Sequence, residues 1–68
     1  MLLLTEEQID KLVNAEGEDV IENIRNICTS TLGLGMNIIY KGTDSQNEIR
    51  DNDELEEFIE SIYDKYSS

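Results

Sequence analysis

Carboxylates are the side chains of this 68-residue chain whose number and spacing most suggest a chemical role. Sixteen acidic residues stand against five basic ones, and the formal net charge is −11 at pH 7. Helical periodicity over the segment Asp51–Tyr66 places apolar side chains on one face. The opposite face carries five acidic residues, which are the main candidates for binding a partner: Asp53, Glu56, Glu57, Glu60 and Asp64.

The spacing of these acids works against the stability of their own helix. Asp53/Glu57, Glu56/Glu60 and Glu60/Asp64 are pairs of like charge at positions i and i+4, and each costs an isolated helix about 0.2–0.5 kcal/mol. Such a conflict between local stability and sequence is expected where function requires it. Neighbouring side chains stand about 5–6 Å apart along the face, a spacing comparable with that of phosphates on one strand. The pattern therefore predicts a mimic of nucleic acid, and its alternative is an ordinary solvated helix face.

Four further residues are candidates for the same surface. Asp44, Glu48 and Asp51 precede the acidic helix and would extend its negative charge. Tyr40 lies near the end of a predicted strand, and exposed tyrosines often anchor protein interfaces. Packing within the fold is the alternative role for Tyr40.

The charge also restricts the class of partner. Binding to nucleic acid or to an anionic membrane requires a basic surface, so neither is expected here. Self-repulsion at this charge destabilises a small domain, and solubility alone needs a net charge of only about 2–8. A basic protein partner fits the sign, whereas an acidic composition without a specific role is the alternative.

Residues for catalysis or for a dedicated metal site are missing from the sequence. The chain has no His, so it offers neither a Ser–His nor a Cys–His arrangement, and with one Cys it cannot supply a zinc site. A calcium loop starting at Asp44 or Asp51 would lack its central Gly. Cys28 falls on an apolar stripe, which is typical of a core position. We therefore expect a protein that is not an enzyme and that uses no cofactor or metal.

The single Cys excludes an internal disulfide, and no apolar run is long enough for a signal peptide or a membrane span. These features indicate a cytoplasmic protein.

Two helices are predicted in the N-terminal half to position these residues. Thr5 and Gln8 form the capping box of a helix over residues 6–15, which Gly17 ends. A second helix follows, opened by Glu18 and Asp19, and the segment Leu32–Gly35 ends it.

The C-terminal half is predicted to form a β-hairpin and a helix. Met36–Lys41 is rich in β-branched residues and favours a strand, and a turn follows at residues 43–46. Residues 47–50 return as a second short strand. Asp51, with Glu54 three positions on, makes a capping box for the helix that runs to Tyr66.

The predicted fold class is therefore α+β, as one small acidic domain over residues 1–68: two N-terminal helices, a short β-hairpin and a C-terminal amphipathic helix. The alternative is a small all-α bundle in which residues 37–40 form one irregular turn.

Two short stretches resemble the colicin-type DNase immunity proteins, which are small acidic inhibitors that cover the basic surface of a nuclease. Thr5–Ile9, followed by Leu12 and Val13, resembles the opening of that family's first helix. Asn37–Tyr40 resembles the start of its short third helix, where the family carries Asp-Leu-Ile-Tyr-Tyr-Pro.

Departures from this family's pattern mean that we assign no family. Lys41 stands where the second tyrosine would be, the proline is missing, and the chain is shorter. The resemblance implies an all-α fold, with Tyr40 and the acids of Glu18–Glu22 in the binding role.

Two hypotheses of function follow. In the first, the protein is a small inhibitor that occludes the basic surface of a nucleic-acid-handling protein such as a nuclease. Phage anti-defence proteins, including anti-CRISPR proteins, and toxin-immunity proteins are settings where such molecules occur. In the second, it is a structural or assembly subunit, for example a homodimer, whose interface contains Leu2, Leu3, Leu4, Leu34 and Met36.

Overall fold

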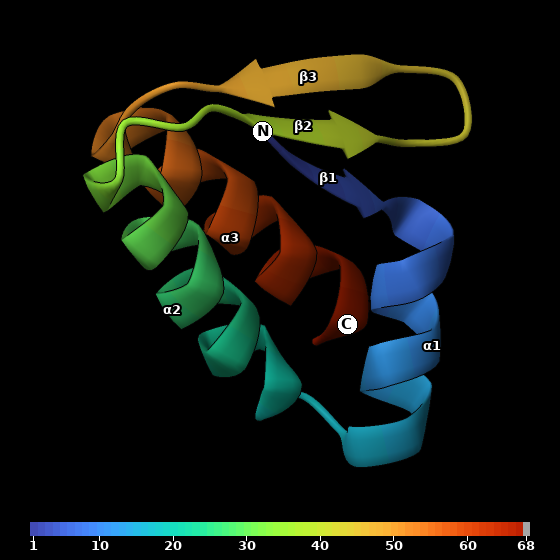
Figure 1. Cartoon of the computed structure of the whole chain (residues 1–68). Helices are drawn as coiled ribbons and strands as arrows, with labels where there is room; N and C mark the ends of the chain where they lie inside the picture. Colours follow the sequence, from blue (N-terminus) through green and yellow to red (C-terminus); the bar gives the residue numbers. More distant parts are fainter. Residues whose placement is uncertain (68) are drawn as a thin grey trace.

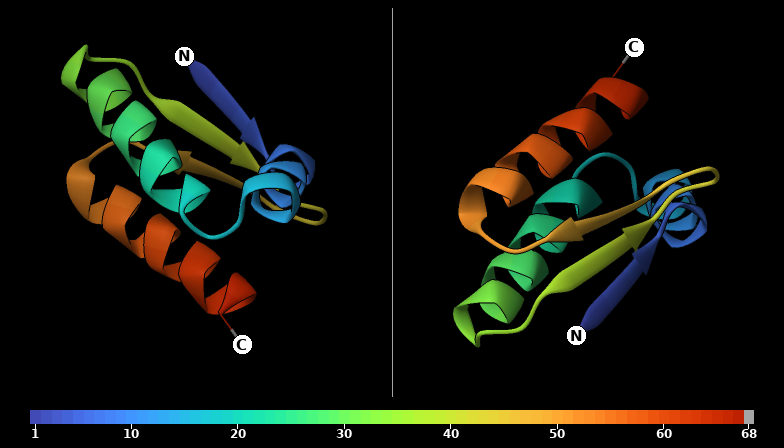
Figure 2. Two further views of the ribbon diagram at one scale, coloured as in Figure 1. Left: turned by 90° about the horizontal axis from the view of Figure 1, so that it is seen from below. Right: turned by 90° about the horizontal axis from the view of Figure 1, so that it is seen from above.

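Helices lie against one face of a small sheet in the computed structural model, which describes residues 1–67 (Figure 1). In chain order the elements are β1 (Leu2–Thr5), α1 (Glu6–Glu16), α2 (Val20–Gly33), β2 (Ile38–Lys41), β3 (Gln46–Ile49) and α3 (Asn52–Tyr66). Helices α2 and α3 run side by side in opposite directions beneath the sheet, and α1 stands at its end (Figure 2). The α+β fold class predicted from the sequence is confirmed.

The sheet contains one strand more than the predicted hairpin. Its order is β1-β2-β3, with β1 parallel to β2 and β2 antiparallel to β3, so the sheet is mixed. The prediction assigned no strand to Leu2–Thr5, in which it named Thr5 as a helix cap and the three leucines as part of a candidate interface. It missed β1 because a run of three leucines shows no alternation, and because its partner lies far along the chain.

The all-α alternative is wrong, and so is the all-α fold that the likeness to immunity proteins implied. Ile38–Lys41 forms the central strand of the sheet instead of a helical turn. β-branched and aromatic side chains favour a pleated, half-buried surface, and this segment contains two isoleucines and a tyrosine in succession.

Of the two predicted capping boxes, the one at the start of α1 is present and the one at the start of α3 is incomplete. Thr5 and Gln8 form the complete capping box of α1. At α3 the Asp51 side chain accepts from the backbone N–H of Glu54, but Glu54 does not complete a second box. Its carboxylate instead accepts from the backbone N–H of Arg50, one residue before the cap, at 2.9 Å. The first turn of α3 is therefore tied to the end of the hairpin.

The core joins the sheet to α2 and α3. Its most completely buried large side chains are Ile21, Cys28, Ile38, Leu55 and Ile59. The burial of the last two fixes the orientation of α3, because a helix that packs one face on a core turns the opposite face to solvent. None of the described helices is long and apolar enough to cross a membrane.

Candidate partner-binding surface

Four of the five predicted acids on α3 form one line on its exposed face. Asp53, Glu57, Glu60 and Asp64 follow one another at intervals of four, three and four residues, so they lie above one another on the helix. All four are exposed, and the buried residues of α3 occupy the opposite face. No ion pair involves any of the four among residues 1–67. We call these four residues the acidic ridge.

Glu56, the fifth predicted acid, belongs to the contact between α2 and α3. Its carboxylate accepts two hydrogen bonds from Arg25 Nη1, at 2.7 and 2.9 Å. Arg25 Nε also lies 3.5 Å from a carboxylate oxygen of Glu22. The guanidinium thus neutralises Glu56 on the flank of α3 and Glu22 on α2, and it leaves the ridge uncompensated.

The predicted extensions of the acidic face are dispersed in the structure. Asp51 caps α3, and Glu48 on β3 accepts from Arg50 Nε at 2.9 Å and from the Asn37 amide at 3.3 Å. Asp44 is exposed in the loop between β2 and β3 and is not part of the row on α3. Only the α3 acids form a continuous row.

Tyr40 is half-buried and packs beneath the surface. Its ring lies 4.8 Å from that of Phe58, centroid to centroid, at an interplanar angle of 55°. Desolvation, followed by the negative charge of Glu6, raises the pKa of the Tyr40 hydroxyl. These two rings contribute to a groove between β3 and α3.

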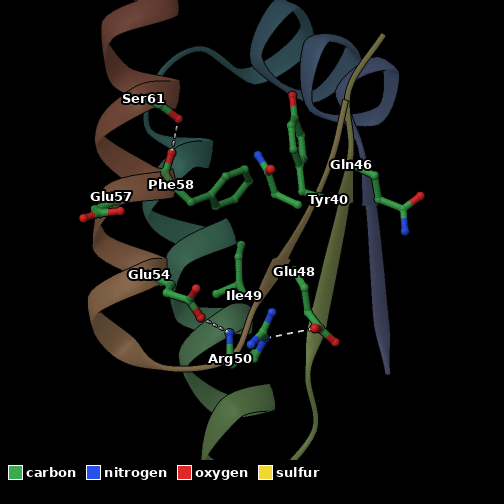
Figure 3. Close-up of a pocket in the computed structure, with 10 residues that line it drawn as sticks. Tyr40, Gln46, Glu48, Ile49, Arg50, Glu54, Glu57, Phe58 and Ser61 are labelled. Atoms are coloured by element: carbon green, nitrogen blue, oxygen red, sulfur yellow. Dashed lines mark hydrogen bonds and ion pairs between the residues drawn. The ribbon is translucent and has the colours of Figure 1, made fainter. Parts of the chain in front are cut away.

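This groove has a volume of about 500 Å³ (Figure 3). One wall is β3 together with Arg50, and the other is the flank of α3 that carries Glu54, Glu57 and Ser61. Glu57 therefore belongs both to the ridge and to the rim of the groove. Sequence reasoning missed the groove because it depends on how α3 sits beside a strand, which helical periodicity does not reveal.

The basic residues are mostly engaged away from the ridge. Among the described residues, Lys11, Arg25, Arg50 and Lys65 form ion pairs, and Lys41 forms none. Six of the sixteen acidic side chains take part in these pairs, and the other ten form no ion pair with residues that the structure describes. The negative charge of the ridge is therefore available to an external cation.

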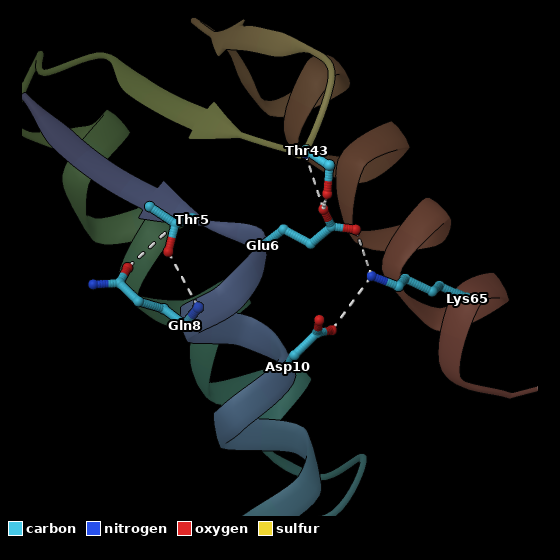
Figure 4. Close-up of polar contacts among 6 residues, drawn as sticks. All are labelled: Thr5, Glu6, Gln8, Asp10, Thr43 and Lys65. Atoms are coloured by element: carbon cyan, nitrogen blue, oxygen red, sulfur yellow. Dashed lines mark hydrogen bonds and ion pairs between the residues drawn. The ribbon is translucent and has the colours of Figure 1, made fainter.

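A second polar cluster holds the end of α3 against α1 and the hairpin loop (Figure 4). Glu6 accepts from Lys65 Nζ at 2.7 Å and from the backbone N–H of Thr43 at 3.0 Å, and Lys65 also lies 3.3 Å from Asp10. The hydrogen bond from Lys65, with those from Thr43, lowers the pKa of Glu6 from 4.5 to about 2. We call Glu6, Asp10, Thr43 and Lys65 the polar latch, whose contacts join three elements of the fold.

The described residues contain little that resembles a reactive centre. Cys28 is fully buried, and desolvation raises the pKa of its thiol to about 11. The thiol therefore stays protonated at neutral pH, whereas the thiolate is the nucleophilic form. No group of three or more His, Cys, Asp or Glu side chains is placed to hold a metal ion within residues 1–67.

In comparisons with protein-family models, curated proteins and solved structures, the chain matches none.

Proposed function

We propose that this protein is a small inhibitor whose acidic ridge binds and occludes the basic surface of a nucleic-acid-handling protein. A nuclease in the cytoplasm is the leading class of target, in a setting of phage anti-defence or toxin immunity. The observation that carries the proposal is the row Asp53, Glu57, Glu60 and Asp64. Within residues 1–67 these four exposed carboxylates stand in line without an ion-pair partner, while four of the five basic residues pair with other acids.

The length of the ridge supports the proposal that it mimics the phosphates of a nucleic acid strand. Asp53 and Asp64 are eleven residues apart, which is about 16 Å along a helix axis. Phosphates of one DNA strand rise about 3.4 Å per nucleotide, so the ridge matches the length of about five of them. The buried face of α3 holds the row in place before binding, and this lowers the entropy lost on association.

Binding of this kind would act by exclusion. A partner cleft lined with Lys and Arg attracts the ridge at long range, which speeds association and makes it sensitive to salt. Once bound, the bulk of the domain prevents the nucleic acid from entering the cleft.

The test compares two variants that change the net charge equally. In the first, Glu57, Glu60 and Asp64 of the ridge become Lys, and in the second, Glu16, Glu18 and Asp19 become Lys. DNA cleavage by a panel of purified nucleases, comprising CRISPR effectors, restriction enzymes and colicin-type DNases, is measured with each protein at low and high salt. We expect the native protein and the second variant to inhibit a member of the panel at low salt, and the ridge variant to lose this inhibition.

Equal inhibition by the two variants would show that only total charge matters and would contradict the proposal. Stronger loss in the Glu16, Glu18 and Asp19 variant would instead favour the surface that immunity proteins suggest. Absence of inhibition across the panel would remove nucleases of these classes as targets.

Exposed apolar residues favour a second candidate function, assembly with another copy or a larger complex. Leu3, Leu34 and Met36 from the predicted interface are 53%, 75% and 40% exposed. Leu2 and Leu4 pack against the core instead. A sedimentation experiment over a range of protein concentrations tests this candidate, and a monomer throughout would contradict self-association.

A further inference from the structure

Strand β3 has a free edge. It forms the border of the sheet, and its only partner in the described chain is β2. The backbone N–H of Gly42 donates to Ser45 at 2.8 Å, which sets the alternation of the antiparallel ladder. In this register the main-chain groups of Asn47 face β2, whereas those of Gln46 and Glu48 point away from it. These outward groups can pair with an added strand.

The groove between β3 and α3 provides room beside this edge. Its volume of about 500 Å³ lies within the range of about 300–1,000 Å³ found for ligand sites. The four residues of β3 span about 14 Å at about 3.4 Å per residue, so an extended segment of five residues covers the whole strand with one residue to spare. Phe58 and Tyr40 reach into the groove from its two sides (Figure 3).

Charge decides what kind of segment the groove accepts. Glu48, Glu54 and Glu57 line it with three carboxylates, and Arg50 contributes the single cation. Glu48 is already paired with Arg50, and Glu54 accepts from the backbone of Arg50. Glu57 has no ion-pair partner in the described part of the chain. Glu54 likewise has no ion-pair partner there, and its carboxylate points toward Arg50 and the groove, whereas that of Glu57 lies at the rim on the outer side of α3 (Figure 3). A cation entering the groove would therefore meet the carboxylate of Glu54, with Glu57 at the rim.

A second copy of this chain is a poor occupant of the same edge. Pairing of two β3 strands would bring one Glu48 near the other, and like charges opposite one another destabilise a sheet. An acidic segment of any other protein meets the same repulsion. The matching occupant is extended and cationic.

We propose that the free edge of β3 binds an extended segment rich in Lys and Arg as a fourth strand of the sheet. The main-chain groups of Gln46 and Glu48 supply the ladder hydrogen bonds, and Glu54 receives a cationic side chain. This inference builds on the proposed function, since it identifies the part of a basic partner that the inhibitor would grip beside its ridge.

The experiment uses two capped peptides of sequence Lys-Arg-Val-Arg-Lys, one unmodified and one N-methylated at alternate residues. Both carry the same charge, but the methylated peptide cannot complete a β ladder. Each is titrated into the isotope-labelled full-length protein and followed by NMR. We expect the unmodified peptide to shift the Gln46, Glu48 and Glu54 amides and to slow hydrogen exchange at Gln46 and Glu48. Because it loses one or two hydrogen bonds, the methylated peptide should bind with about tenfold lower affinity than the unmodified one.

Equal binding of the two peptides, or shifts confined to Asp53, Glu60 and Asp64, would overturn the proposal in favour of simple charge attraction. A variant of the protein gives a second check. Gln46→Pro removes an outward N–H without changing charge and leaves the bonds between β2 and β3 in place. It should reduce binding of the unmodified peptide to the level of the methylated one, and full retention of binding by a folded variant would overturn the inference.

Nuclease inhibition separates this proposal from the function on which it builds. If Gln46→Pro keeps full inhibition while the ridge variant loses it, the ridge acts alone and the strand-addition proposal fails. If no nuclease of the panel is inhibited but the peptides behave as expected, the edge binds basic segments and the inhibitor proposal fails for the nuclease classes tested.

Discussion

At the scale of single residues, Glu6 and Glu57 show two uses of the same side chain. Glu6 accepts from Thr43 and Lys65, which lie 37 and 59 positions away in the sequence, and its side chain is 29% exposed. Glu57 has no ion-pair partner within residues 1–67. Helical spacing was sufficient to place Glu57 on an exposed face. It could not predict the contacts of Glu6, because those depend on elements that meet only in the folded chain.

The lowered pKa of Glu6 predicts how stability depends on pH. A carboxyl group whose pKa falls from 4.5 to about 2 on folding contributes stability above pH 4.5, and this contribution is lost as the pH falls from 4.5 towards 2. Glu6→Gln should therefore lower the melting temperature at pH 7, and its difference from the native protein should shrink as the pH approaches 2. Melting followed by circular dichroism across this range measures the difference.

Glu7→Gln is the control for this prediction. Glu7 is the next residue, and within residues 1–67 its ion pair is with Lys11 at the surface. Its substitution should change the melting temperature much less, because exposed pairs contribute little. A constant difference between native protein and Glu6→Gln from pH 7 to pH 2 would show that the latch does not act through the Glu6 charge.

At the scale of elements, the sequence pattern predicted those helices, caps and strands that depend on residues close together in the chain. The capping box at Thr5, the strand at residues 38–41 and the amphipathic helix α3 all follow from residues within a few positions of one another. Strand β1 was missed because its hydrogen bonds are to residues about 36 positions further along. The groove was missed for the same reason, since it lies between two elements.

The register of β1 yields a prediction for a pair of proline substitutions. Leu2 donates to Asn37, so the alternation of a ladder directs the N–H of Leu4 towards β2 and that of Leu3 towards solvent. Leu4→Pro should lose a ladder hydrogen bond and be less stable than Leu3→Pro by about 1–2 kcal/mol. Urea denaturation measures the difference, and the reverse order would show that β1 does not pair in this register.

At the scale of the whole molecule, the two edges of the sheet differ in character. Strand β3 borders a groove lined by carboxylates, whereas β1 on the other edge exposes Leu3. The net charge of −11 and the amphipathic helix were evident from the sequence. The separation of an acidic side from an apolar edge was not, because it depends on the position of β1.

The uncompensated ridge predicts a conflict between stability and binding. Replacing Glu57 and Glu60 with Gln removes repulsion among neighbours on α3, so the free energy of unfolding should rise by about 0.5 kcal/mol at low salt. The gain should shrink at high salt, where ions screen the repulsion. Urea denaturation at two salt concentrations measures it, with nuclease inhibition as the second readout.

The same double replacement at Glu16 and Glu18 is the control, since it changes the charge equally outside α3. The ridge variant should gain stability and lose inhibition, and the control should retain inhibition. A ridge variant that becomes less stable would mean that these carboxylates support the fold.

The parallel pairing of β1 with β2 also has a consequence for how the molecule is made. On the ribosome, Leu2–Thr5 is synthesised before both intervening helices. It can pair in the sheet only after Ile38–Lys41 has been synthesised. Closing so long a loop carries an entropic cost that no early contact repays, so this strand should dock late. Until then a leucine-rich segment remains uncovered in the nascent chain, and the strong negative charge of the polypeptide would help to keep such chains apart.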